Sequence, residues 1–149
     1  MLRVLSGGLE ILSGLLLIAL MAVTGLDVIG RYLVDAPLPG AFELTEMILG
    51  ALVFAALPLV GRSGGHVEVD LLTTLLPDRI GRGLLWLAAV VAAGVLLVFA
   101  WRLGALGLQQ AEDGTRSISL GLPFAPLALF GAASCLCAAI FGFVRAARS

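Results

Sequence analysis

Charged side chains are scarce in this sequence, and one of the two strong cations is missing. Only 13% of its 149 residues are charged, and lysine does not occur, so arginine supplies every permanent positive side-chain charge. Soluble domains usually carry about 25% charged residues, and this deficit argues against a soluble fold. The net charge of −1 and the lack of any basic run also argue against nucleic acid as a partner.

Side chains that bind metals or carry redox chemistry are equally few. The sequence has one histidine, His66, and two cysteines, Cys135 and Cys137. One histidine cannot supply the pair needed for bis-histidine haem ligation or a di-iron site. The cysteines are two residues apart, which places them on different faces of a helix, and the C-x-x-C pair of membrane thiol oxidoreductases is missing. We therefore predict no enzyme activity, no cofactor and no metal site.

What the chain does have is apolar length. Apolar residues make up 60% of it, against about 45–50% in soluble domains. Four uncharged runs stand out, and two of them are shorter than the roughly 20 residues that a spanning helix needs, so we expect these to extend through their flanking carboxylates. The sequence predicts an all-α integral membrane protein with one membrane domain, residues 1–149, and four transmembrane helices at approximately 9–30, 42–61, 83–107 and 118–144.

The arginines predict how these helices are oriented. Two of them, Arg31 and Arg116, fall on one side of a four-helix topology. By the positive-inside rule the side with more arginines is cytoplasmic, which places both termini in the cytoplasm. A cleaved signal peptide is the competing interpretation of residues 1–25, but Glu10 interrupts it and no A-x-A site follows, so we expect an uncleaved first helix. The cytoplasmic arginines are Arg3, Arg62, Arg79, Arg82, Arg145 and Arg148.

A second group of charges maps to the opposite end of the predicted helices. Asp27 and Arg31 are four residues apart, and Glu43 and Glu46 are three apart, so each pair shares one helix face. Charges within a membrane are often ion or substrate ligands, but a structural ion-pair cluster or a subunit interface is at least as well supported here. Pairing between Arg31 and Glu43 is one possibility. The candidate cluster is Asp27, Arg31, Tyr32, Glu43, Glu46 and Arg102.

Small residues recur at three- and four-residue spacings in the last predicted helix. Such surfaces let helix backbones approach closely in lipid. They predict either packing among the four helices of this chain or docking to another membrane subunit, and the sequence does not choose between the two. The residues are Ala128, Gly131, Ala132, Cys135, Ala139 and Gly142.

Three motifs in a fixed order resemble a known family. They are D-V-I-G-R-Y at 27–32, P-L-P-G-A-F-E-L at 37–44 and R-S-G-G-H-V-E-V-D-L-L at 62–72. Their order and spacing resemble the DctQ-like small membrane subunit of tripartite ATP-independent periplasmic (TRAP) transporters. Phe42 departs from the tryptophan common in that family before the acid, and Gly61 replaces a more usual small or basic residue. The matching residues are Arg31, Tyr32, Glu43, Gly65, His66, Val69 and Asp70.

The resemblance implies a role in secondary active uptake. In such a system a periplasmic substrate-binding protein delivers an organic acid, a C4-dicarboxylate or a related carboxylate, to a large membrane subunit. A sodium gradient drives import there, and the small subunit acts as a scaffold. The chain is then expected to be a multi-pass protein of the bacterial inner membrane whose partners are the large TRAP membrane subunit, the binding protein and the lipid bilayer.

The same resemblance explains the polar stretch G-R-S-G-G-H-V-E-V-D at residues 61–70. It looks like the cytoplasmic exit of the second helix, followed by a short segment lying in the membrane interface before the third. His66 and Asp70 are four residues apart and can pair on one helix face. A metal site is not expected, because only one nitrogen ligand exists. The loop motif consists of Arg62, Gly65, His66, Val69 and Asp70.

Two other functions compete with this interpretation. A self-sufficient small multidrug exporter also has four helices and works as a dimer, but it needs a carboxylate deep in its first helix. Here Glu10 and Asp27 lie at opposite ends of that helix, with no acid between them. A membrane structural protein without a transport role is compatible with the composition alone.

Overall fold

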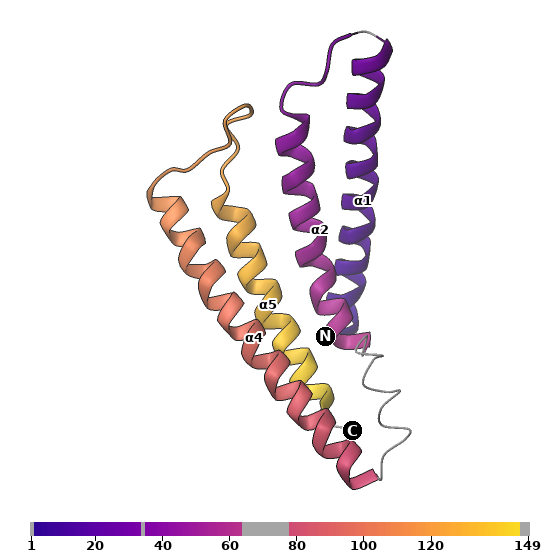
Figure 1. Ribbon diagram of the computed structural model, residues 1–149, viewed down its shortest axis with the longest axis vertical. Helices are drawn as coiled ribbons and strands as arrows, with labels where there is room; N and C mark the ends of the chain where they lie inside the picture. Colours follow the sequence, from indigo (N-terminus) through magenta and orange to yellow (C-terminus); the bar gives the residue numbers. More distant parts are fainter. Residues whose placement is uncertain (1, 34, 64–77, 147–149) are drawn as a thin grey trace.

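Four α-helices make up the described part of the fold. The computed structural model describes residues 2–33, 35–63 and 78–146, and each of the four helices is long and apolar enough to cross a membrane. The predicted all-α membrane fold with four spanning helices is thereby confirmed. In chain order the helices are α1 (Leu2–Leu33), α2 (Ala41–Ser63), α4 (Asp78–Glu112) and α5 (Ala125–Ala146) (Figure 1).

The predicted interfacial segment between the second and third spanning helices lies outside the described residues. So do four members of the loop motif, Gly65, His66, Val69 and Asp70. The fifth member, Arg62, belongs to the last turn of α2.

The start of the last helix was predicted wrongly. Residues 118–124 were assigned to that helix because they are uncharged, but α5 begins only at Ala125. Gly121, which precedes α5, has a φ of 65°, and this value is not helical. Pro123 lies in an isolated bridge with Arg116. Pro126 falls in the first turn of α5, where its missing N–H needs no partner. The other helices extend beyond their predicted ends, and α4 continues to Glu112.

The helices form an open row. α1 packs against α2, α2 against α5 and α5 against α4, whereas α1 contacts neither α4 nor α5 within the described residues. Figure 1 shows the same spatial order, with the beginning of α1 and the end of α5 at one end of the molecule. The opposite end carries residues 35–40 and 113–124 and is called the connection end below.

Helix α5 carries most of the buried residues. Ala128, Gly131, Ala132, Cys135 and Ala139 are all buried between its two neighbours. A Cβ atom on Gly131 would lie 2.8 Å from the ring of Phe54 in α2. Five of the six predicted small residues therefore serve packing within this chain, whereas Gly142 is half-buried and nothing lies within 4 Å of a Cβ atom added there.

On the other side of α5, α4 packs against it at a second glycine. A Cβ atom on Gly107 would lie 2.9 Å from Leu129 Cγ and 3.2 Å from the Leu129 backbone nitrogen. Close approach of this kind drives helix association in lipid, where burying apolar surface gives no advantage over contact with lipid tails. The contact between α4 and α5 therefore depends on the absence of a side chain at position 107.

We predict that Gly107→Ala destabilises the purified chain by about 1–3 kcal/mol through overpacking against Leu129. Gly94→Ala in the same helix is the matched control, because nothing lies within 4 Å of its added Cβ. Alanine is also the better helix former, so the control should be neutral or slightly stabilising. The measurement is thermal unfolding of both variants in detergent. Equal melting temperatures would contradict a close α4–α5 contact at Gly107.

Candidate functional site

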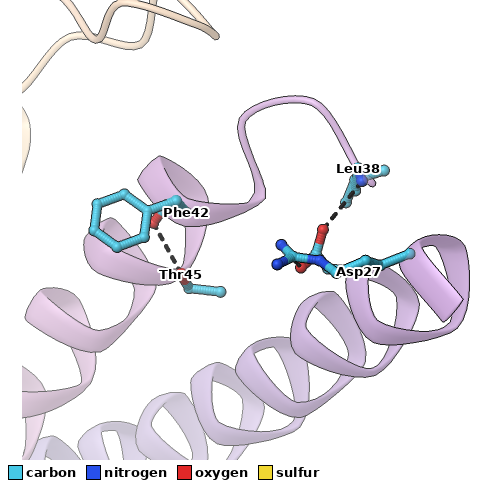
Figure 2. A network of polar contacts seen from close by, with 5 residues as sticks. Asp27, Leu38, Phe42 and Thr45 are labelled. Carbon is cyan, nitrogen blue, oxygen red and sulfur yellow. Dashed lines mark hydrogen bonds and ion pairs between the residues drawn. The ribbon is translucent and has the colours of Figure 1, made fainter. Parts of the chain in front are cut away.

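The first polar site at the connection end is built on Asp27. Its Oδ2 accepts a hydrogen bond from Arg31 Nη2 at 3.0 Å. Its Oδ1 accepts one from the backbone N–H of Leu38 at 3.1 Å, which Figure 2 shows. The Asp27 side chain is 18% exposed and that of Arg31 60% exposed. Both carboxylate oxygens are thus engaged, and the bond to Leu38 fixes the chain as it returns from α1 toward α2.

The turn after α1 needs glycines as well as the aspartate. The Ala36 N–H donates to the Gly30 carbonyl oxygen at 3.0 Å, and a Cβ on Gly30 would meet the Ala36 carbonyl oxygen at 2.6 Å. Gly40, directly before α2, has a φ of 73°, a left-handed value that glycine adopts without strain. A side chain at position 40 would also meet Leu120 Cγ at 2.5 Å. The α1–α2 connection therefore lies directly against the α4–α5 connection.

The α4–α5 connection is a tight loop closed by Ser117. The Ser117 N–H donates to the Leu122 carbonyl oxygen at 2.8 Å, and the Ser117 hydroxyl oxygen accepts from the Leu122 N–H at 3.1 Å. The Gly121 N–H donates to the Ser117 carbonyl oxygen at 3.1 Å. Ser117 is buried, so this loop is ordered by its own hydrogen bonds rather than by helix formation.

Glu43 joins the two connections. It lies in the first turn of α2, and its Oε1 accepts from the Ser119 N–H at 2.9 Å. Its Oε2 accepts from the N–H groups of Ser119 at 3.1 Å and Leu120 at 3.2 Å. Hydrogen bonds to an ionised carboxylate are roughly twice as strong as neutral ones. We call this arrangement the Glu43 clasp, since it ties the α1–α2 hairpin to the α4–α5 hairpin.

The predicted charge cluster divides into separate parts in the structure. Asp27 and Arg31 form the one ion pair recorded among the described residues. Glu43 binds backbone amides, whereas Glu46 is exposed on α2. Arg102 is exposed on α4, about ten residues before the helix ends at Glu112. Tyr32, in the last turn of α1, is exposed as well.

Sequence reasoning missed the partners of Glu43. The loop residues Ser119 and Leu120 were assigned to a spanning helix, where their N–H groups would be occupied by intrahelical bonds. The glycine and proline at 121 and 123 were the available signals for a loop.

Metal ligands do not converge in the described part of the chain. No three His, Cys, Asp or Glu side chains come together there as a metal site would require. Cys135 is buried, Cys137 is half-buried, and neither is in a disulfide. The two carboxylates at the connection end have different structural roles: Asp27 fixes the α1–α2 connection, and Glu43 ties that hairpin to the α4–α5 hairpin.

Residues 20–149 match the family model described as "Tripartite ATP-independent periplasmic transporters, DctQ component". The matched range contains α2, α4, α5 and the part of α1 that carries Asp27 and Arg31. No curated protein matches the chain. The family resemblance found in the three sequence motifs is confirmed.

The Glu43 clasp predicts that Glu43→Gln lowers the thermal stability of the purified chain. A neutral amide offers one acceptor oxygen and no charge, so it cannot hold all three N–H contacts. Glu46→Gln is the matched control, because Glu46 lies in the same helix and is exposed. We expect the melting temperature to fall for the first variant and to stay unchanged for the second. A fall of equal size in both would show that the clasp contributes nothing specific.

A second prediction concerns Arg31 and Glu43 together. Because Arg31 bonds to Asp27 and Glu43 bonds to the loop amides, the two side chains share no partner. Losses in stability at sites without shared partners usually add. The melting temperatures of Arg31→Gln, Glu43→Gln and the double variant should therefore show additive losses. Recovery of stability in the double variant would show that the two residues pair directly.

Proposed function

Because this chain belongs to the DctQ family, the small membrane component of TRAP transporters, we propose that it scaffolds the large membrane subunit during binding-protein-dependent uptake. The family match over residues 20–149 carries this proposal. The family is a transporter component rather than an enzyme family. We further propose that a sodium gradient drives the uptake and that the cargo is an organic acid of the C4-dicarboxylate class or a related carboxylate.

The use of the carboxylates at the connection end supports a scaffold. Both oxygens of Asp27 and both oxygens of Glu43 accept hydrogen bonds from this chain itself. These acids therefore act as fixed structural ties and are not displayed as ligands for a passing ion or substrate. The engagement of Asp27 also counts against the small multidrug exporter, whose mechanism needs an available carboxylate deep in the first helix. The other acid of α1, Glu10, lies toward the beginning of that helix.

The packing of the row supports the same role. Small residues hold α2 and α4 closely against α5, and the Glu43 clasp ties the two hairpins at one end. A layer fixed along its length and at one end moves as a unit, which is what an immobile support for a moving transport subunit requires. The broad faces of the row stay free for lipid or for a larger partner.

The proposed orientation places both termini in the cytoplasm of a bacterial cell, with the protein in the inner membrane. Four antiparallel spans bring the start of α1 and the end of α5 to the same end (Figure 1). The arginine-rich side of the sequence is that end, and the positive-inside rule favours its retention in the cytoplasm. The connection end then faces the periplasm, where a binding protein would approach.

Reconstitution tests the proposed function. Liposomes that contain this chain alone should take up no organic acid, whereas liposomes with the large membrane subunit as well should do so. That uptake should require the added binding protein and an inward sodium gradient, and a C4-dicarboxylate should be the first cargo tested. Liposomes with the large subunit alone are the control. Sodium-driven uptake by the small subunit alone would contradict a scaffold role, and uptake driven by another ion would contradict sodium coupling.

A further inference from the structure

Arg102 lies on the side of α4 that faces away from the rest of the chain. Ala100 is buried, and Gly104 and Gly107 approach Ala132 and Leu129 of α5. At 3.6 residues per turn these three positions share one side of the helix, and position 102 falls roughly opposite to them. Since α4 packs against α5 alone among the described helices, Arg102 points out from the edge of the row.

The surroundings of Arg102 on that side are apolar. Most of the exposed residues one to three turns away on the same side are large and hydrophobic, and the exposed Ala105 and Gln109 lie on that side as well. The arginine is the one charged residue among them. We call this surface the Arg102 face, and it consists of Val91, Val95, Val98, Phe99, Arg102 and Leu106.

Arg102 lies within Trp86–Glu112, the part of α4 that is long and apolar enough to cross a membrane. It precedes Gln109, the next polar residue toward the helix end, by about 10 Å at helical rise. Side chains in a helix lean toward its N-terminus. Arg102 therefore leans away from the nearer membrane surface, which opposes its reaching the headgroups on that side.

The described part of this chain offers Arg102 no carboxylate. Its one recorded ion pair is between Asp27 and Arg31, and Glu43 is occupied by the loop amides. Charged side chains within membranes are costly and are almost always paired or directed into a protein interior. An arginine that leans into an apolar surface therefore needs its partner from another chain.

We propose that the Arg102 face is the contact surface for a second membrane-spanning chain that places a carboxylate against Arg102. An arginine fork matches a carboxylate with two parallel hydrogen bonds, and the surrounding valines and phenylalanine exclude water from such a pair. This inference rests on the proposed function in one respect: it identifies the second chain as the large membrane subunit. It adds the helix, the face and the chemistry of the contact.

The test is association of the two full-length subunits in lipid nanodiscs, measured for the wild type, Arg102→Gln and Arg102→Lys. We expect Arg102→Gln to weaken association by at least about tenfold, because it leaves the partner carboxylate buried without a cation. Arg102→Lys should fall between the two, since lysine keeps the charge but loses the fork. Arg116→Gln, in the α4–α5 connection, is the control for removing one arginine outside the spanning segments and should associate like the wild type.

The same variant also distinguishes the partner by its effect on the chain alone. If a carboxylate of the large subunit pairs with Arg102, then Arg102→Gln should leave the melting temperature of the isolated small subunit unchanged or raised. Wild-type association of Arg102→Gln, or a loss no larger than that of Arg116→Gln, would overturn the proposal. Loss of bound anionic lipid without any loss of association would assign Arg102 to a lipid phosphate and would also overturn it.

In each of these outcomes the wild-type subunits still associate, so a failure here is distinguishable from a failure of the scaffold role. Where association is lost, a charge exchange completes the test. Arg102→Glu should associate more weakly than Arg102→Gln, and an acid-to-arginine change at the contacting position of the large subunit should restore it. Failure of every such exchange would overturn the carboxylate pairing.

Discussion

Everything in this fold depends on how closely α2 and α4 approach α5. Apolar side chains gain nothing by leaving lipid for a helix neighbour, so association must come from close packing and hydrogen bonds. The ring of Phe54 packs against Gly131, and Leu129 packs against Gly107. Both contacts are so close that a methyl group on either glycine would clash with the neighbouring side chain. With α5 held from both sides, the two helical hairpins become one layer, and α1 joins that layer through α2 alone.

The carboxylates complete what the packing begins. The small residues set how closely the helices approach, but they offer few directional contacts. Asp27 and Glu43 supply direction, since each accepts hydrogen bonds from backbone N–H groups in a connecting segment. Because the donors are backbone N–H groups, these hydrogen bonds do not depend on the position of a flexible side chain in the connecting segment. A region that the sequence suggested as a charge cluster thus acts as two separate structural ties.

This distribution of charge also separates the internal function of the chain from its external one. Asp27 and Glu43 are engaged within the chain, while Arg102 on the edge helix is directed outward. A subunit that uses these two carboxylates as internal ties is suited to supporting a transporter rather than to carrying its cargo. The exposed Arg102 is the one charged position on the otherwise apolar Arg102 face, and a partner can recognise the face there.

The sequence by itself determined the four spanning helices and the family. Uncharged runs of sufficient length must be helical in lipid, because no water is available to satisfy the backbone. The Asp27–Arg31 pair was likewise accessible, since a spacing of four residues places both on one helix face. Only the tertiary structure decided the partner of Glu43, the inward role of the small residues on α5 and the loop at 117–124. Each of these depends on which helices become neighbours. Glu43 and Ser119 are 76 residues apart in the sequence, and composition does not predict a contact between them.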